Sequence, residues 1–245
     1  MSNTEKSDYF KDLEALSEDK RLTIEDILLN YLSLIRRRDL PRLLAHYEIF
    51  KEVMNLPGSI IEVGVYKGSG LFTWANFLET FCPGDRNRLV FGFDDFEGYT
   101  KYSEDDKNFQ QFIEDKNHHL VSDYDFISRL LELKTKDNLL PGVKRAEIIN
   151  GDVLETVDGF LSQHVGLRLC LLYIDVSLYH PTKHALEKFY DLVVPNGIIA
   201  FNGYGQIPHE GEGKALDEFL DSRNLSPKFQ RFNFSPMPSV YFKKC

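Results

Sequence analysis

A glycine-rich segment, EVGVYKGSG at residues 62–70, follows an apolar run and precedes an expected helix. Gly64 and Gly68 let the backbone turn and approach a ligand without a Cβ clash, and the free N–H groups at the helix start can hold an anion. The spacing puts Tyr66 where a dinucleotide site has its second glycine. The acid at the strand's end, Glu62, suits a ligand with a positive amino group. S-adenosylmethionine carries both an ammonium and a carboxylate, so we expect Glu62, Gly64, Tyr66, Gly68 and Ser69 to bind it. The alternative is a strand-to-helix turn without a ligand.

Acidic side chains also end the next two expected strands. Asp94 and Asp95 stand at the end of residues 88–94, where an acid can accept hydrogen bonds from both hydroxyls of a ribose. Gly151 and Asp152 follow the strand expected over 146–150. Because ligands collect at the carboxyl ends of parallel strands, we expect them to face the adenine edge of the same cofactor. Asp152 is an equal candidate for the N-cap of the helix that follows.

Candidates for the reaction itself follow the fourth and fifth expected strands. Methyl transfer is an in-line displacement in which the enzyme aligns a nucleophile and accepts its proton. His180 and His209 are the candidate bases, since histidine titrates near neutral pH, although either could be a surface residue. We expect Asp175 near the methionine end of the cofactor. Aromatic walls suit a ring-shaped polar acceptor, so Tyr179 and Tyr204 are candidate substrate-binding residues.

The elements that must position these residues alternate between strands and helices from residue 58 onward. Strands are expected over 59–65, 88–94, 146–150, 169–175 and 197–202, and helices over 71–81, 154–161, 181–192 and 215–222. This alternation predicts a parallel sheet with helices on both faces. Two further runs, 229–234 and 239–243, lack a helix between them and so predict an antiparallel hairpin. The fold class is therefore α/β, a Rossmann-like methyltransferase fold with a mostly parallel seven-stranded sheet.

The rest of the chain adds two segments to this domain, which we bound at 58–245. Residues 1–57 are expected to form a charged tail up to about residue 20 and then helices, with Thr23 as an N-cap and Pro41 at a helix start. Residues 98–140 are longer than a usual connection and include an expected helix over 124–133. We interpret them as a lid-like, substrate-binding insertion, with a decorative surface excursion as the alternative.

Composition excludes some classes of function. The formal net charge is −9, from 29 Lys and Arg against 38 Asp and Glu, which argues against nucleic acid or anionic lipid as a partner. A local basic cluster remains at Arg36, Arg37, Arg38 and Arg42. It is either a solvated helix face or a set of salt-bridge partners for nearby acids, or else it is a site for an anionic substrate group such as a phosphate.

Cysteine usage and hydropathy indicate the compartment. The chain has three cysteines, which give no disulfide framework: Cys82, Cys170 and Cys245. Residues 1–20 have no apolar signal core, and no apolar run is long enough to cross a membrane. We therefore expect a cytoplasmic protein.

Taken together, several segments resemble the macrocin-type (TylF-like) O-methyltransferase family. They are IIEVGVYKGSG, FGFDDFEG, INGDVLETV, LYIDVSLYHPTKHAL, PNGIIAFNGYG and GKALDEF, within about residues 40–219. FxFDxFEG with D-x-x-LY-x-x-T is fairly specific to this group. The resemblance implies methylation of a sugar hydroxyl, cofactor binding by Glu62, Gly64, Asp94 and Asp152, and a homo-oligomer.

The chain departs from that family at its metal site. The family pattern is D-x-D-L-Y after strand four and D-D-Y after strand five, which supplies metal ligands and a base. Here the positions read Asp175, Ser177, Asn202 and Gly203. A hard divalent cation wants several oxygen ligands, mostly anionic, so we expect the Mg²⁺ site to be lost or very weak and the base at 177 to be missing.

Two hypotheses follow. The first is a methyltransferase that works without a metal on a hydroxyl, or less favourably an amine, of a sugar or similar small metabolite. The second is a cofactor-binding protein that has lost catalysis and has a regulatory role. The missing acids favour the second, and the intact glycine segment is compatible with both.

Overall fold

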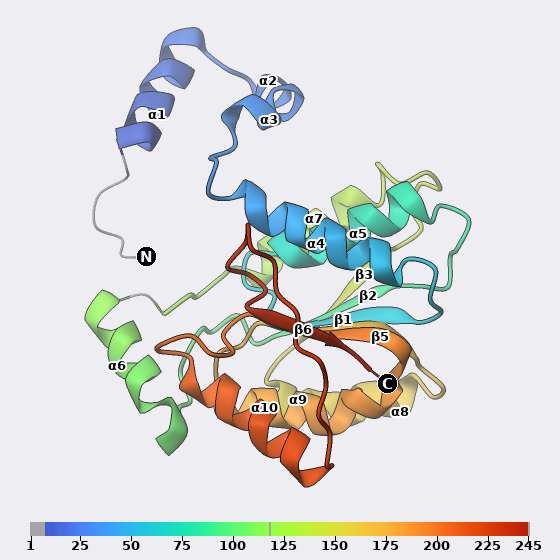
Figure 1. The fold of residues 1–245 in the computed structure, drawn as a ribbon. Coiled ribbons are helices and arrows are strands. Elements are labelled where there is room, and N and C mark those ends of the chain that lie inside the picture. The colour runs from blue at the N-terminus through green and yellow to red at the C-terminus, as the bar shows by residue number, and fades with distance from the viewer. Residues whose placement is uncertain (1–7, 118, 245) are drawn as a thin grey trace.

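The computed structural model describes residues 8–117 and 119–244, which share one six-stranded sheet (Figure 1). The strands are β1 (Ser59–Val63), β2 (Val90–Asp94), β3 (Ala146–Asn150), β4 (Leu169–Ile174), β5 (Val193–Phe201) and β6 (Val240–Lys243). Their order is β3-β2-β1-β4-β5-β6. All pairs are parallel except β5 with β6, which is antiparallel. The expected α/β class is confirmed, with six strands and not seven.

The expected C-terminal hairpin is wrong, because residues 229–234 do not join the sheet as a strand. Within them, Gln230 forms a single antiparallel bridge with Tyr241. Prolines surround this run at 227, 236 and 238, and proline cannot donate to a ladder. The aromatic side chains of the run pack on β6 instead, as Phe229 does on Phe242. The final strand, β6, pairs with β5.

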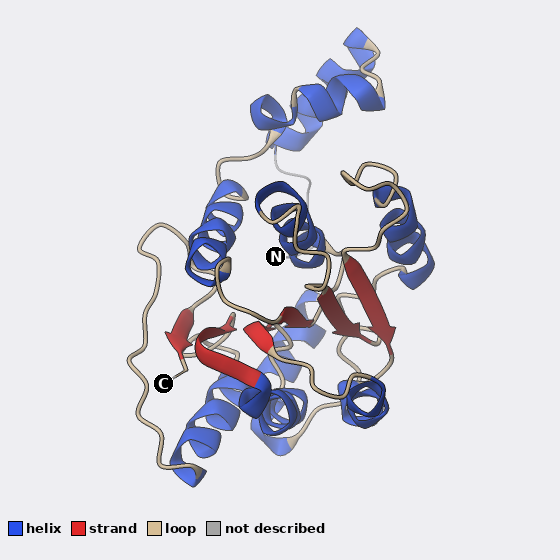
Figure 2. Ribbon diagram, turned by 90° about the vertical axis from the view of Figure 1, so that its right-hand side faces the viewer, coloured by secondary structure: helices blue, strands red, loops and turns tan. Residues whose placement is uncertain are grey.

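Helices cover both faces of the sheet (Figures 1 and 2). One face carries α4 (Leu40–Val53), α5 (Ser69–Phe81) and α7 (Tyr124–Lys134), and the other carries α8 (Val153–Gln163), α9 (Tyr179–Phe189) and α10 (Glu210–Ser222). A short helix η2 (Tyr190–Leu192) leads from α9 into β5. Every residue of β1 and β4 is buried, as expected for parallel strands with both faces covered. This burial holds the strand ends, and the loops after them, in fixed positions.

The N-terminal helices stand apart from this body in Figure 1: α1 (Asp8–Lys20), α2 (Ile24–Leu29) and α3 (Tyr31–Leu34). The expected tail is thus a helix from Asp8 onward, and residues 1–7 lie outside the described residues. The cap at Thr23 is confirmed, because its hydroxyl accepts from the N–H of Asp26 at 3.1 Å. Neither α2 nor α3 buries a residue.

The insertion between β2 and β3 contains η1 (Glu104–Asp106), α6 (Lys107–Lys116) and α7. Its first half is tied to the body by Asp106, which is 1% exposed and accepts from the N–H of Tyr179 at 2.9 Å. Its second half joins the helical layer beside β3 through α7, and the expected helix over 124–133 is confirmed. Its role as a lid stays a prediction.

Two of the cysteines, Cys82 and Cys170, are free thiols, and Cys245 lies outside the described residues. Across residues 8–117 and 119–244, no helix has both the length and the apolar character that a membrane span requires.

Candidate active site

A cavity of about 360 Å³ opens at the carboxyl ends of β1, β2 and β4, and we refer to it as the strand-end cavity. Its lining includes most of the residues expected to bind the cofactor or act on it: Gly64, Tyr66, Ser69, Asp94, Asp95, Gly151, Asp152, Asp175 and His209. A second cavity of about 240 Å³ lies between α5, α7 and β3 and shares no lining residue with it. The strand-end cavity is therefore the candidate active site.

The glycine segment takes a conformation that only small or specially held residues adopt. Gly64 and Gly68 have φ of 96° and 84°, and Tyr66 has φ of 50°. A Cβ on Gly64 would lie 2.3 Å from the carbonyl oxygen of Asp175, so the β1 and β4 ends can approach closely only with glycine here. Helix α5 begins after Gly68 without a side-chain cap, which leaves N–H groups free toward an anion.

The carboxylate of Asp94 holds this segment in place. Its Oδ2 accepts from the N–H groups of Val65 and Tyr66, both at 2.7 Å, and its Oδ1 accepts from Phe96 at 2.7 Å. Asp95 accepts from the N–H of Glu97 at 3.0 Å. Asp94 therefore has a structural task in addition to the ribose contact expected of it, and that contact stays a prediction for both acids.

Asp152 serves as the N-cap of α8, which was one of its two expected roles. Its side chain accepts from the N–H of Leu154 at 3.0 Å, and it pairs with Lys101 at 2.7 Å. It also lines the strand-end cavity together with Gly151. Capping and a cofactor contact are compatible here, because the carboxylate is partly exposed at the cavity edge.

The side chain of Glu62 is fully buried, and neither of its carboxyl oxygens has a hydrogen-bond partner among the described residues. Burial raises the pKa of this carboxyl well above its ordinary value; Arg42 opposes the rise, Asp175 and Asp94 add to it, and the neighbouring indole of Trp74 opposes it. A buried carboxyl without a partner is costly, and an ammonium group beside it would remove that cost. The chemistry of this group fits the amino group of S-adenosylmethionine, but Glu62 lies behind Gly70 and outside the cavity lining, so the contact stays a prediction.

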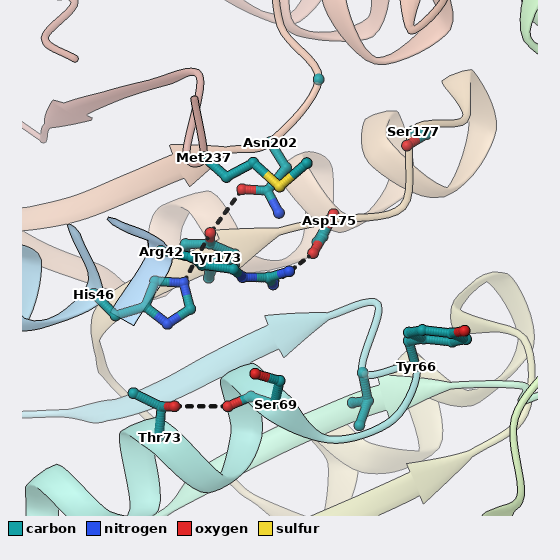
Figure 3. Close-up of polar contacts among 12 residues, drawn as sticks. Arg42, His46, Tyr66, Ser69, Thr73, Tyr173, Asp175, Ser177, Asn202 and Met237 are labelled. Atoms are coloured by element: carbon teal, nitrogen blue, oxygen red, sulfur yellow. Dashed lines mark hydrogen bonds and ion pairs between the residues drawn. The ribbon is translucent and has the colours of Figure 1, made fainter. Parts of the chain in front are cut away.

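Arg42 and Asp175 form an ion pair at the end of β4, with Nη2 donating to Oδ2 at 2.9 Å (Figure 3). Behind the pair, His46 lies 3.0 Å from the hydroxyl of Tyr173, which donates to Oδ1 of Asn202 at 2.6 Å. Burial, and next the charge of Arg42, hold the pKa of His46 well below its ordinary value. His46 is therefore a neutral member of this network.

The imidazole of His209 lines the strand-end cavity and packs on Phe109 with ring centroids 5.0 Å apart. Its Nδ1 is buried and has no hydrogen-bond partner among the described residues. Burial lowers the pKa of His209, whereas the charges of Asp175 and Glu210 oppose that change. Near neutral pH the ring is uncharged, which is the form that can accept a proton.

The other residues expected around the acceptor do not meet in this cavity. His180 is exposed on α9, outside the cavity lining. The hydroxyl of Tyr179 donates to Glu218 at 2.5 Å, and that of Tyr204 donates to Asp217 at 2.9 Å. Both tyrosines lie outside the lining, and their hydroxyls are engaged with α10.

Tyr99 and Arg42 are two of the lining residues that were not among the expected site residues. Tyr99 comes from the insertion, and its hydroxyl lies 3.4 Å from Oγ of Ser177. Arg42 belonged to the arginine cluster, for which acidic partners were one interpretation. That interpretation holds for Arg36 with Asp39, whereas Arg42 pairs with the distant Asp175 inside the cavity. The sequence places Arg42 in the helix that starts at Pro41, but it gives no sign of the ion pair, because Asp175 lies far away in the chain.

The four positions where the family pattern has acids do not fit a divalent cation. Asp175 is paired with Arg42, and Oδ1 of Asn202 accepts from Tyr173. The backbone N–H groups of Ser177 and Gly203 donate to Glu212, at 3.1 and 2.5 Å. Within the described ranges, no group of three or more His, Cys, Asp or Glu side chains is arranged to hold a metal ion.

Comparisons with known proteins identify the family and the fold. The family model described as macrocin O-methyltransferase (TylF) matches residues 2–244. The crystal structure of CalS11, a calicheamicin methyltransferase, has a TM-score of 0.85 and 23% sequence identity, and the match covers 99% of this chain and 94% of that one. The apo structure of CalS11, described as a TDP-rhamnose 3′-O-methyltransferase, has a TM-score of 0.80 and 24% identity over 99% and 96% of the two chains. The O-methyltransferase NovP has a TM-score of 0.66 and 20% identity over 84% and 80%. No curated protein matches the sequence.

Proposed function

The chain belongs to the macrocin O-methyltransferase (TylF) family, and from this premise we propose that it methylates a hydroxyl group of a sugar without the help of a metal ion. Membership makes it an S-adenosylmethionine-dependent methyltransferase. The sugar acceptor is supported by the printed description of CalS11, which acts on TDP-rhamnose. At 24% identity that structure shares the fold, so the acceptor of this chain is our proposal.

One observation carries the proposal. The strand-end cavity joins the glycine segment to an imidazole, His209, whose Nδ1 is buried without a partner among the described residues. A cofactor site and a neutral base therefore share one cavity. This is the arrangement that methyl transfer to a hydroxyl requires.

Different residues of the chain would bind the cofactor and accept the proton. Glu62, which is buried behind Gly70 of the cavity lining, and the start of α5 would hold the amino and carboxylate groups of the cofactor. Asp95 and Asp152, which line the cavity, would meet its nucleoside part. When bound, S-adenosylmethionine would supply an electrophilic methyl group, and its sulfur would keep the electron pair of the carbon–sulfur bond. His209 would take the proton that the acceptor hydroxyl loses.

The test is product formation from a panel of nucleoside-diphosphate sugars and glycosides, followed by mass spectrometry with EDTA or with Mg²⁺. We expect a mass gain of one methylene on at least one acceptor, at the same rate in both conditions. Calorimetry with S-adenosylhomocysteine runs beside it. Binding without turnover of any acceptor would favour a cofactor-binding protein that has lost catalysis, and the absence of binding would refute both functions.

A further inference from the structure

The candidate active site holds a cation of its own, the guanidinium of Arg42. Arg42 stands in the first turn of α4, and 32% of its side chain remains exposed although it pairs with Asp175. It lines the strand-end cavity together with Ser177 and His209. A guanidinium stays charged at any pH at which a protein is folded, and it offers five N–H donors in a planar fork. The pair with Asp175 uses Nη2, so this cation still has donors for a ligand.

Neighbouring residues fill the places where metal ligands would stand. A Cβ added to Gly203 would lie 2.6 Å from Cβ of His209 and 3.2 Å from Oε1 of Glu212. An aspartate at 203 would therefore need His209 to move. The position of His209 therefore requires a glycine at 203, and a substitution of Gly203 by an acid would not by itself restore a metal ligand.

The charges in the site also disfavour a divalent cation. Asp175 and the guanidinium of Arg42 neutralise each other (Figure 3), and Asn202 contributes no charge. A divalent cation beside them would meet an existing positive charge at close range, without the anionic oxygens that such an ion requires.

We propose that Arg42 takes the part that the family pattern gives to a divalent cation: its N–H groups hold the acceptor hydroxyl and stabilise the negative charge that grows on its oxygen. The inference rests on the proposed function, because it states how the same site handles its acceptor. The competing explanation is that Arg42 only neutralises Asp175.

Three variants separate these explanations. Arg42→Gln removes the charge, Arg42→Lys keeps a charge but loses the planar fork, and the double variant Arg42→Gln with Asp175→Asn removes both members of the pair. We expect kcat to fall about 10²- to 10³-fold in Arg42→Gln and in the double variant, as for the loss of one preorganised donor, with a smaller fall in Arg42→Lys. Each variant must still bind S-adenosylhomocysteine. The control is Arg129→Gln on α7, where the arginine is 78% exposed and kcat should not change.

A double variant with wild-type kcat would overturn the proposal, because Arg42 would then serve only to balance Asp175. A wild-type rate that EDTA abolishes and Mg²⁺ restores would overturn it too. Calorimetric titration with Mg²⁺ gives a readout independent of turnover: we expect no saturable heat from the wild type, and saturable binding that Asp175→Asn removes would contradict us. If the wild type turns over no acceptor, the proposed function fails, whereas this titration still decides whether a cation other than Arg42 belongs in the site.

Discussion

Replacing Gly70 by alanine should displace one carboxyl group and weaken cofactor binding while the fold persists. Gly70 is the second residue of α5, and its Cβ would lie 2.1 Å from Oε1 and 2.6 Å from Cδ of Glu62. Cβ atoms essentially never approach other heavy atoms within 3.0 Å, so the carboxyl must retreat by about 0.9 Å. It has to do so inside a fully buried site.

The size of the effect follows from the contact that would be lost. A hydrogen bond to a charged group contributes about 1.5–3 kcal/mol, and about 1.4 kcal/mol corresponds to a tenfold change in affinity. If Glu62 holds the cofactor's amino group, the Kd should rise about 10- to 100-fold. The fold should tolerate the change, because alanine gains about 0.5–1 kcal/mol over glycine in a helix, which offsets part of the crowding.

Isothermal titration with S-adenosylhomocysteine measures the affinity, and thermal unfolding measures the stability. Gly159→Ala is the matched control, since Gly159 is exposed in α8 and its Cβ would meet nothing within 4 Å. We expect that control to keep its Kd and to raise the Tm by about 1–4 °C. A wild-type Kd in Gly70→Ala would refute the reasoning, because Glu62 would then not contact the ligand.

Three further predictions concern titration and stability. Cofactor affinity should increase with pH, because burial raises the pKa of Glu62 although Arg42 opposes the rise, and an ammonium ligand must therefore displace a proton from this carboxyl. Calorimetry in buffers of different ionisation enthalpy should detect the release of that proton. A pH-independent Kd would contradict the prediction. His209→Asn should lower kcat about 10²- to 10⁴-fold at an unchanged Kd. Because burial lowers the pKa of His209 below 6.5, wild-type activity should hold at neutral pH and fall on acidification, and the same profile in the variant would exclude His209 as the base. Arg145→Met should reduce the free energy of unfolding by about 3 kcal/mol in urea titrations. Arg145 is the more buried of the two arginines that pair with Glu79, at a distance of 2.6 Å, and the variant leaves Glu79 without it. A loss below about 1 kcal/mol would show that this ion pair is dispensable.

Much of the fold was predictable because its signals are local. The runs that became β1 and β4 are almost continuously apolar, and a strand buried on both faces needs that pattern. The cap at Thr23 needs only an acid three residues later. The run over 229–234 was misjudged because aromatic residues favour strands, whereas its pairing depends on distant partners and on the prolines around it.

The cofactor side of the site was also predictable, because parallel strands bring their carboxyl ends to one edge. Once β1, β2 and β4 are recognised, their end residues must be neighbours. No comparable rule predicts which residues lie on the acceptor side of the cavity. His180 and His209 look equivalent in the sequence, and the rotation of α9 exposes the first whereas the loop before α10 brings the second to the cavity.

The sequence by itself determined the alternation of strands and helices, the conformation of the glycine segment and the absence of acids at 177, 202 and 203, since each depends on residue type and short-range geometry. The tertiary structure alone decided what stands beside Asp175. Arg42 is 133 residues away in the chain, and a contact over that separation depends on how α4 packs across the sheet. No local pattern specifies such packing, because it depends on the shapes of all the side chains in between.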